Sequence, residues 1–556
     1  MISKSFEVDK KKVRGHSYCL FLLLLLSITN IFAQQTNNLE VIWVKAVDST
    51  FSVNGYGYLS TTPGDVNGDG YYDILYYGNE RSWEGRAILY CGGNTLDTIP
   101  DAIFSNEMGF DAVCMGDFNG DGYSDVAFGC VLNEPVAEVL IFLGGNPIDT
   151  ICDFRIRDLY VGANFGCAVS SGDVNGDGYK DLIVGAWGIA DGRGRVYIYF
   201  GSTNFDTIPD VILNGGHYND MEQFGFSVAS SGDVNNDGID DLIIGARDFG
   251  LYRQGRIYVY YGGNPMNSIY DVAMSGEGSW HNLGEFGVDF IRRYQTFDYA
   301  VTSTPIWGST PGWYDPGKVY VLFGGNPMDS VPDVCMIGRT DSSSLGFSIS
   351  RTGYISGSLF DGIIAGAPIE PSGSISYAGC AYTWRSEPNL DTIPDAWLKG
   401  LQYDDGIGWA ITTAGDVDGD GRDEVMISNY AATQSPRRVW VCKYTGVGIE
   451  ERLTHYAKRL TLEVWPNPVK SVLRVRCPFT VKEMKVYDIT GKVVKTFEQV
   501  GSRQNTEYRE LRWDLRNENK KRVANGIYFM EASISEKRGK SREQIIKEIR
   551  KITIIK

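Results

Sequence analysis

The sequence predicts an all-β protein in which a seven-bladed β-propeller is followed by a small immunoglobulin-like β-sandwich. Three observations support this prediction: short runs of β-forming residues between turn residues, a unit that recurs with the length of a propeller blade, and a change of composition near residue 450. The chain has 556 residues, 66 of them glycine, which is long enough for two domains and typical of many tight turns.

One unit recurs between about residue 40 and residue 445. Its clearest copy begins with Phe224 and Gly225, continues through an acidic loop and the apolar run 241–246, and ends at 262–265. Each copy contains about four β-forming runs bounded by turn residues, which predicts a four-stranded antiparallel blade. The acidic loops begin at Asp65, Asp117, Asp173, Asp233 and Asp416.

The number of blades follows from the spacing of these loops. The first four loops start about 52 to 60 residues apart, and the gap from the fourth to the fifth is about three such periods. Two copies without an acidic loop, at 286–327 and 346–368, fill this gap, so that seven units result. We also expect residues 41–44, which stand before the first unit, to add a strand to the last blade and close the ring.

These units resemble the FG-GAP repeats of the integrin α-chain propeller. Phe165–Gly166 and Phe224–Gly225 match the first half of that signature, residues 366–368 match the second half, and the acidic loops lie between the two. The resemblance covers roughly residues 40 to 445. It implies that the first strand of each blade leads through the acidic loop to the second, and that the protein binds a ligand in adhesion or recognition.

The acidic loops have the ligand spacing of a calcium site. In the third unit Asp173, Asn175 and Asp177 stand at positions one, three and five. Asp181 stands at position nine, and the main-chain carbonyl of Tyr179 completes the set. About six to eight oxygen ligands with several carboxylates favour Ca²⁺ over Mg²⁺. The candidate ligands are Asp65, Asn67, Asp69, Tyr71, Asp73, Asp117, Asn119, Asp121, Tyr123, Asp125, Asp173, Asn175, Asp177, Tyr179, Asp181, Asp233, Asn235, Asp237, Ile239, Asp241, Asp416, Asp418, Asp420, Arg422 and Glu424.

Two other interpretations of these loops exist. An EF-hand requires a Glu at position twelve and flanking helices, but here position twelve is an apolar or aromatic residue inside a β-run, so this interpretation fails. The loops can also be turns without metal, but five loops with the same acidic spacing favour about five calcium sites, mainly structural. The fifth and sixth units have Arg292–Arg293 and residues 354–357 at the equivalent places, and we expect no metal there.

The sequence contains no recognisable catalytic motif. The histidines that follow the N-terminal stretch are scattered, and neither a Gly-x-Ser-x-Gly nor a His-Glu-x-x-His motif is present. We therefore expect a binding protein and not an enzyme. The alternative is a polysaccharide-degrading lyase or glycosidase, because two carboxylates can meet across one face of a propeller. A net charge of −17 argues against binding to nucleic acid.

Aromatic residues gather in the connections between second and third strands and between blades, mostly in units four and five. We expect these connections on the face opposite the calcium loops, where flat rings suit a protein or glycan ligand. The candidate ligand-binding residues are Tyr218, Tyr252, Trp280, Trp307, Trp313 and Tyr314. The alternative is that these side chains pack between blades.

The N-terminal stretch and a change in charge define the remaining domains. A basic patch, the apolar run Leu20–Phe32 and a following Ala33 predict a signal peptide at 1–33, and no later stretch is apolar enough to span a membrane. We expect the propeller at 34–447, a linker at 448–459, and a β-sandwich at 460–556, where the chain becomes basic.

The C-terminal module resembles the C-terminal sorting domain of cargo of the type IX secretion system. Trp465–Pro468, the segments 486–494 and 525–529, and the final basic and apolar strand carry this resemblance, although the insert 535–544 is unusual. The resemblance implies contact with outer-membrane secretion machinery and a secreted or cell-surface protein. A related immunoglobulin-like stalk module, which implies attachment instead of export, is the alternative.

Overall fold

The structure is a computed structural model, and it divides into two compact units, Met1–Gly446 and Val447–Lys556. The predicted signal peptide at 1–33 and the predicted linker at 448–459 lie outside the described residues. The structure describes residues 34–46, 58–59, 64–79, 85–106, 112–131, 137–158, 160, 162–216, 221–293, 296–304, 316–355, 361–386, 390–430, 437–445, 463–465, 473–477, 481–488, 492–500, 509–517, 520–538 and 542–554.

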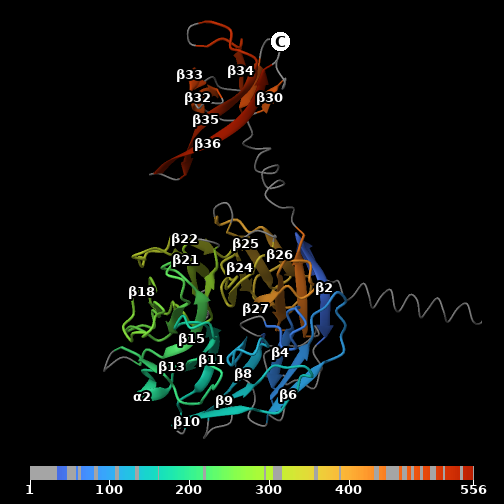
Figure 1. The fold of residues 1–556 in the computed structure, drawn as a ribbon, viewed down its shortest axis with the longest axis vertical. Helices are drawn as coiled ribbons and strands as arrows, with labels where there is room; N and C mark the ends of the chain where they lie inside the picture. The colour runs from blue at the N-terminus through green and yellow to red at the C-terminus, as the bar shows by residue number, and fades with distance from the viewer. Residues whose placement is uncertain are drawn as a thin grey trace, which may run out of the picture. The chain divides into compact units, whose positions relative to one another are not determined.

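The first unit is a seven-bladed β-propeller, as the sequence predicts (Figure 1). Each blade is one antiparallel sheet, and the blades follow one another around a ring in chain order. The first three blades consist of β3 (Tyr58–Leu59), β4 (Ile74–Asn79), β5 (Gly85–Tyr90) and β6 (Ala102–Asn106); β7 (Ala112–Gly116), β8 (Asp125–Cys130), β9 (Ala137–Phe142) and β10 (Phe154–Asp158); and β11 (Phe165–Gly172), β12 (Asp181–Ala186), β13 (Arg195–Tyr199) and β14 (Val211–Asn214). A short helical turn, α2 (Ile189–Gly192), lies between β12 and β13.

The fourth to seventh blades repeat this order of strands. Their strands are β15 (Phe224–Gly232), β16 (Asp241–Ala246), β17 (Arg256–Tyr260) and β18 (Val272–Ser275); β19 (Val288–Ile291), β20 (Tyr299–Thr304), β21 (Lys318–Phe323) and β22 (Val334–Ile337); β23 (Ile349–Arg351), β24 (Gly362–Ala367), β25 (Cys380–Arg385) and β26 (Ala396–Gly400); and β27 (Ile407–Gly415), β28 (Glu424–Asn429) and β29 (Arg438–Tyr444).

The seventh blade takes its outer strand from the start of the chain. β2 (Leu39–Ala46) pairs antiparallel with β29, from Leu39 opposite Tyr444 to Ala46 opposite Arg438. The predicted closing strand is therefore confirmed. The sequence did not indicate that β1 (Gln34–Asn37) would pair with β26, so that the sixth blade has five strands.

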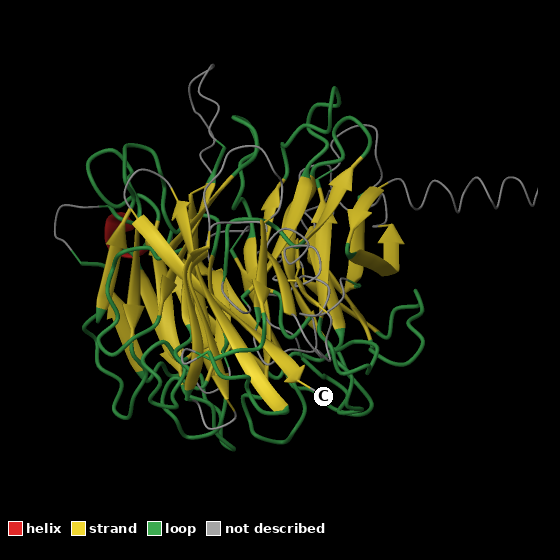
Figure 2. Cartoon of the chain, turned by 90° about the horizontal axis from the view of Figure 1, so that it is seen from above, coloured by secondary structure: helices red, strands yellow, loops and turns green. Residues whose placement is uncertain are grey.

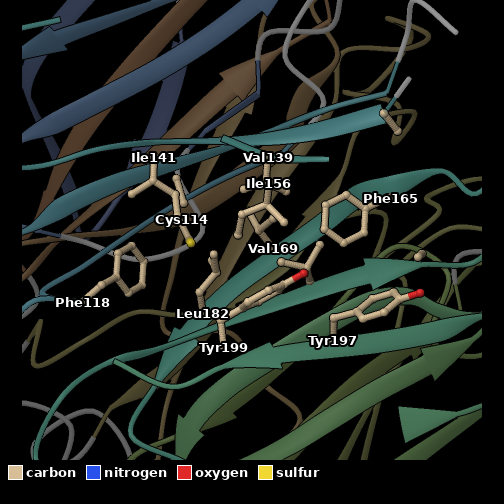
Figure 3. Packing of buried hydrophobic residues seen from close by; sticks show 14 of the residues in the cluster. Cys114, Phe118, Val139, Ile141, Ile156, Phe165, Val169, Leu182, Tyr197 and Tyr199 are labelled. Carbon is tan, nitrogen blue, oxygen red and sulfur yellow. The ribbon is translucent and has the colours of Figure 1, made fainter. Parts of the chain in front are cut away.

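The core of the propeller lies between the blades. Every pair of neighbouring blades, the seventh and the first included, shares a cluster of buried apolar side chains. Figure 3 shows the cluster between the second and third blades, which contains Cys114 and Ile141 from one blade and Val169, Leu182 and Tyr199 from the other. The central strands are buried on both faces, because each blade is covered by its two neighbours.

The FG-GAP signature corresponds to a close backbone contact between blades. A Cβ atom placed on Gly185 of the third blade would lie 2.2 Å from the carbonyl oxygen of Gly225 in the fourth blade. Gly225 also has a φ of 85°, which side chains rarely adopt. Both positions therefore require glycine, and the same contact recurs between Gly245 and Gly284.

The loops of the propeller gather at the two ends of the strands, as Figure 2 shows. Because successive strands of a blade are antiparallel, the loops between first and second strands share one end with the loops between third and fourth strands. We call this end the acidic face. The opposite end holds the connections between second and third strands and those between blades, and we call it the aromatic face.

The second unit contains two antiparallel sheets. They are formed by β30 (Glu463–Trp465), β31 (Leu473–Cys477) and β34 (Arg509–Trp513), and by β32 (Val481–Asp488), β33 (Val493–Val500), β35 (Gly526–Arg538) and β36 (Arg542–Ile554). Trp513 of one sheet makes an edge-to-face contact with Tyr528 of the other. Most of the unusual insert at 535–544 extends the hairpin of β35 and β36, where Ser535 pairs with Ile545 and Arg538 with Arg542. The immunoglobulin-like topology itself remains a prediction.

Candidate functional site: the acidic loops and the aromatic face

Each acidic loop connects the first and second strands of its blade and winds around the aspartate at position one. In the third blade Asp173 Oδ1 accepts hydrogen bonds from the backbone N–H of Gly176 at 2.7 Å and of Asp177 at 3.1 Å, and its Oδ2 accepts one from Gly178 at 2.9 Å. Asp65 and Asp117 make the same three bonds in their loops. Position six is a glycine with a φ near 90° in the first four loops, so the turn itself requires glycine there.

Positions three and five face each other across the loop. Asn175 Nδ2 donates to Asp177 Oδ2 at 2.9 Å, and the backbone N–H of Asp177 donates to Asn175 Oδ1 at 2.8 Å. The N–H of Tyr179 completes the turn by donating to Asp177 Oδ1 at 3.0 Å. The first, second and fourth loops repeat this arrangement with Asn67, Asn119 and Asn235.

The acid at position nine is buried and clamps two backbone segments. Asp181 accepts the N–H of Val174 at 2.8 Å and the N–H of Gly201 at 2.9 Å, and it has no solvent exposure. Burial raises the pKa of Asp181 to about 7. Burial likewise raises the pKa of Asp73 and Asp125 to about 7, and that of Asp241 and Glu424 to about 8. These carboxyl groups are therefore costly to ionise unless a cation lies close by.

The loop residues fit a hard cation. They offer carboxylate, amide and main-chain oxygens, and a carboxylate has about four lone-pair sites, so the hydrogen bonds above leave acceptor capacity for a metal. Within the described part of the chain, Asp416, Asp418 and Asp420 form a group of carboxylates whose ligand atoms all lie within 4.8 Å of one another. In this loop the cation beside the carboxylates is the ammonium group of Lys443, which contacts Asp418 and Asp420. The raised pKa values of the acids at position nine are a second reason to expect a cation here, because a bound cation would remove the cost of ionising these acids.

The acidic loops also join the blades, which the sequence did not reveal. The carbonyl at position one accepts the N–H of the residue at position eight in the next blade. The carbonyl at position two accepts an N–H from the loop between the third and fourth strands of the next blade. We call the first contact the inter-blade latch. Its bonds are Ser124 N to Asp65 O at 2.8 Å, Lys180 N to Asp117 O at 3.1 Å, Asp240 N to Asp173 O at 3.0 Å, Asp298 N to Asp233 O at 3.0 Å, Asp361 N to Arg292 O at 3.0 Å and Tyr72 N to Asp416 O at 3.2 Å.

Side chains at position seven strengthen the same joints. The Tyr179 ring lies against Gly120 of the preceding loop, and the Tyr123 and Tyr71 rings lie against Gly68 and Gly419 in the same way. From the sequence, position seven is expected to supply only a main-chain carbonyl. In the structure the side chain at position seven of the first four loops also packs against position four of the preceding acidic loop.

The fifth blade keeps the latch without the acids, with Arg292 at position one. The sixth blade joins the seventh by a different contact, in which the N–H of Tyr354 donates to Asp423 Oδ2 at 2.6 Å. Both blades also add positive charge. Arg351 of β23 reaches the fourth blade, where its Nη1 donates to Ser231 Oγ at 2.8 Å. Its charge interacts with those of Asp289, Asp361, Asp240 and Asp423, which come from four blades. Asp361 is buried, whereas Arg351, Asp289, Asp240 and Asp423 are densely surrounded by protein but keep some contact with solvent.

Replacing Arg351 by Met should destabilise the propeller by about 2–3 kcal/mol, because it removes the positive charge shared by these acids. We expect less than the ~3–5 kcal/mol of a fully buried pair, since solvent still reaches the group. Urea unfolding followed by tryptophan fluorescence measures the change. The double variant Arg351→Met with Asp289→Asn should recover part of the loss. Equal stability of the single variant and the wild type would contradict this role.

The structure brings two of the six candidate ligand-binding residues together on the aromatic face. Tyr252 follows β16 and Trp280 precedes β19, and the N–H of Trp280 donates to the carbonyl of Tyr252 at 2.6 Å. Both side chains are exposed, Tyr252 by 62 % and Trp280 by 50 %, which is more exposure than packing between blades would leave them. Tyr218, Trp307, Trp313 and Tyr314 lie outside the described residues.

Charge and backbone strain accompany the two rings. The Arg253 guanidinium lies 5.3 Å from the centre of the Trp280 ring, within range of a cation–π interaction. Trp280 has a φ of 64° and Arg253 a φ of 52°, a region that bulky residues rarely adopt. Such strain of about 1–3 kcal/mol concentrates at functional sites, where neighbouring structure enforces it.

The acidic face carries a repeated apolar feature that the sequence analysis missed. Six blades expose one branched aliphatic side chain from the loop between their third and fourth strands, and each loop is fixed by an Asx turn before that residue. The repeated Asp-Thr-Ile-Pro-Asp motif was the signal in the sequence. These side chains are Ile99, Ile151, Ile208, Ile269, Val331 and Ile393.

The propeller matches known repeat families over three stretches. Residues 165–199 and 224–260 match the FG-GAP repeat, and residues 65–128 match the FG-GAP-like repeat. The chain carries FG-GAP repeats. The acidic loops of the first four blades therefore lie inside recognised FG-GAP sequence, which confirms the resemblance drawn from the motifs.

Integrin alpha chains are among the relatives of this FG-GAP propeller. Integrin alpha-5 of Xenopus laevis is 31% identical over 159 residues, which is 27% of this chain and 15% of that protein. Integrin alpha-3 of Cricetulus griseus is 38% identical over 107 residues, 18% of this chain and 10% of that protein, and integrin alpha-V of Gallus gallus is 32% identical over 224 residues, 36% of this chain and 21% of that protein. The chain thus spans between about a tenth and a fifth of these relatives.

The second unit matches a sorting module. Residues 463–548 match the secretion system C-terminal sorting domain. This domain indicates export through type IX secretion to the cell surface or the outside, as the sequence predicts. Among the described residues, no helix has both the length and the apolar character needed to cross a membrane.

Proposed function

We propose that this FG-GAP propeller is a calcium-stabilised adhesion or recognition protein that binds a protein or glycan ligand through its aromatic face. The observation that carries the proposal is the exposed pair Tyr252 and Trp280, held side by side by a backbone hydrogen bond. Export by the sorting domain and the similarity to integrin alpha chains support a role outside the cell.

Calcium has a structural role in this proposal. The acidic loops supply the joints between neighbouring blades, and their ligand oxygens lie on the face opposite Tyr252 and Trp280. A cation bound in the loops of the first four blades would neutralise their aspartates and fix the carbonyls at positions one and two. The aromatic face is then held on a rigid ring, and the metal itself does not contact the ligand.

The aromatic face suits a ligand that presents flat or apolar surface beside polar groups. Tyr252 and Trp280 offer large contact areas with little conformational entropy to lose, and Arg253 adds a cation with several hydrogen-bond donors. Sugar rings and protein side chains both meet this description. The alternative of polysaccharide cleavage stays a prediction from the sequence.

Replacing Trp280 by Ala should weaken ligand binding at least tenfold, about 1.4 kcal/mol, because a half-exposed tryptophan at the centre of a binding face is a typical hot spot. The ligand is first identified by applying the wild-type protein to a glycan array and to a panel of extracellular matrix proteins. Affinity for the best ligand is then measured by surface plasmon resonance.

Ile269→Ala is the control, because this residue is also exposed, by 73 %, and belongs to the fourth blade but lies on the acidic face. Its affinity should equal that of the wild type, and both variants should melt within a few degrees of it. Unchanged binding by Trp280→Ala and Tyr252→Ala would reject this face as the ligand site. Binding lost only together with folding would instead assign the two rings a structural role.

A further inference from the structure

The acidic loop of the seventh blade differs from the other four, because a lysine enters it. Lys443 of β29 places its Nζ 2.7 Å from Asp418 Oδ2, and the same Nζ also contacts Asp420 Oδ2. These are the acids at positions three and five. Together with Asp416 they form the close group of carboxylates described above.

The strand register shows that this lysine is specific to the seventh blade. Val425 pairs with Cys442, just as Ile74 pairs with Tyr90 in the first blade and Leu182 with Tyr199 in the third. In the seventh blade the residue that follows the partner is Lys443, which contacts the acid at position three. In the first, second, third and fourth blades the equivalent residue is Cys91, Leu143, Phe200 and Tyr261.

The change at this position accompanies a change in the loop itself. Position three is Asn in the first four loops, whereas it is Asp418 in the seventh. In the first four loops the amide of the Asn donates to the carboxylate at position five, but in the seventh loop the ammonium of Lys443 donates to both acids. Positions one, three and five of the seventh loop thus carry three carboxylates instead of two, and the ammonium group of Lys443 pairs with two of them.

We infer that the ammonium group of Lys443 takes the place of a calcium ion in the seventh loop. This loop therefore binds no calcium, whereas the acidic loops of the first four blades do. The inference rests on the proposed calcium binding of those four loops. Calcium would need to lie about 2.3–2.6 Å from the oxygens that Lys443 contacts. The ammonium group and the calcium ion would then need the same position, so only one of them can be bound.

The seventh loop lies at the joint where the ring closes. Asp416 O accepts the N–H of Tyr72, and Val417 O accepts the N–H of Gly93, so this loop joins the last blade to the first. β29, which carries Lys443, also pairs with the closing strand β2. The joint that closes the ring therefore stays ordered at any calcium concentration, while the joints formed by the other four loops depend on the ion.

Counting bound calcium tests the inference. The full chain, freed of metal and then dialysed against millimolar calcium, should hold four ions by native mass spectrometry, and Lys443→Met should hold five. Lys443→Arg keeps the charge and should hold four. Lys180→Met is the matched control, because this lysine pairs with Asp240 beside another loop and lies outside the place of the ion, so four ions are expected.

The outcomes separate the inference from the proposed function. Five ions in the wild type, or four in both the wild type and Lys443→Met, would overturn the inference. No bound calcium in any form would instead reject the calcium proposal on which it rests.

Hydrogen exchange of the wild type keeps the inference testable if Lys443→Met fails to fold. Without calcium, the N–H of Gly421, which donates to Asp416 at 2.8 Å, should stay protected, while the equivalent N–H of Gly178 should exchange at least tenfold faster than with calcium. Equal loss of protection at both glycines would overturn the inference.

Discussion

Removing calcium is expected to lower the melting temperature of the propeller by roughly 5–10 °C. Each site that is filled to about ten times its dissociation constant stabilises the folded state by about 1.4 kcal/mol, so four such sites contribute about 5–6 kcal/mol. For a domain of this size that free energy corresponds to a shift of several degrees. Differential scanning calorimetry of metal-free protein, with and without millimolar calcium, measures it. Identical melting temperatures would remove the metal proposal.

The pH dependence of the metal-free protein is part of this prediction. Burial raises the pKa of Asp73, Asp125 and Asp181 to about 7 and that of Asp241 to about 8, well above the usual value near 4. A raised folded pKa favours folding at low pH, and this contribution is lost as the pH rises through the folded pKa. Without calcium, the protein should therefore melt at a higher temperature at pH 5 than at pH 8.

Calcium should reduce or reverse this difference, because the ion binds the ionised carboxylates and competes with protons. Calorimetry of the same metal-free preparation at both pH values provides the comparison. A calcium-free melting temperature that rises from pH 5 to pH 8 would contradict the assignment of position nine as a set of buried acids.

Deleting residues 34–46 is expected to abolish cooperative folding of the propeller. The deletion removes β1 and β2, and therefore the outer strand of the seventh blade and its contact with the first. Trp43 is buried in the cluster between these blades, where its ring meets the Tyr90 ring edge-on and its Nε1 donates to the carbonyl of Asp97 at 2.6 Å. Circular dichroism melts and size-exclusion chromatography measure the loss.

A point variant gives a milder form of the same test. Trp43→Ala should cost about 3–5 kcal/mol, the usual range for a buried aromatic side chain, and should lower the melting temperature by several degrees. Glu40→Ala is the control on the same strand, since this side chain is exposed. A deletion variant that melts like the wild type would show that the ring does not need its N-terminal strands.

The repeated features of the fold could be read from the sequence because they are local. The Asp-x-Asn-x-Asp-Gly loops, the Phe-Gly and Gly-Ala pairs and the alternation of β-runs each lie within one blade, so their spacing gives the number of blades directly. The closing strand could also be predicted, because a ring with a short last blade needs a strand from the start of the chain.

The contacts between blades could not be predicted, because they depend on which residues the ring brings together. The latch of Asp240 to Asp173 joins residues from two copies of the repeat, and Arg351 contacts Ser231 in a blade two places away. Pairing of β1 with β26 follows from the same closure. None of these contacts has a spacing that a linear pattern would reveal.

The sequence by itself thus determined the all-β class, the seven blades, the five acidic loops and the sorting module, because each corresponds to a local sequence pattern. Only the tertiary structure decided that Tyr252 and Trp280 share an exposed face and that Lys443 enters one acidic loop. The physical reason is the same in both cases. The direction of a side chain depends on strand register and on the neighbouring connection, and these are fixed only when the blades pack into a ring.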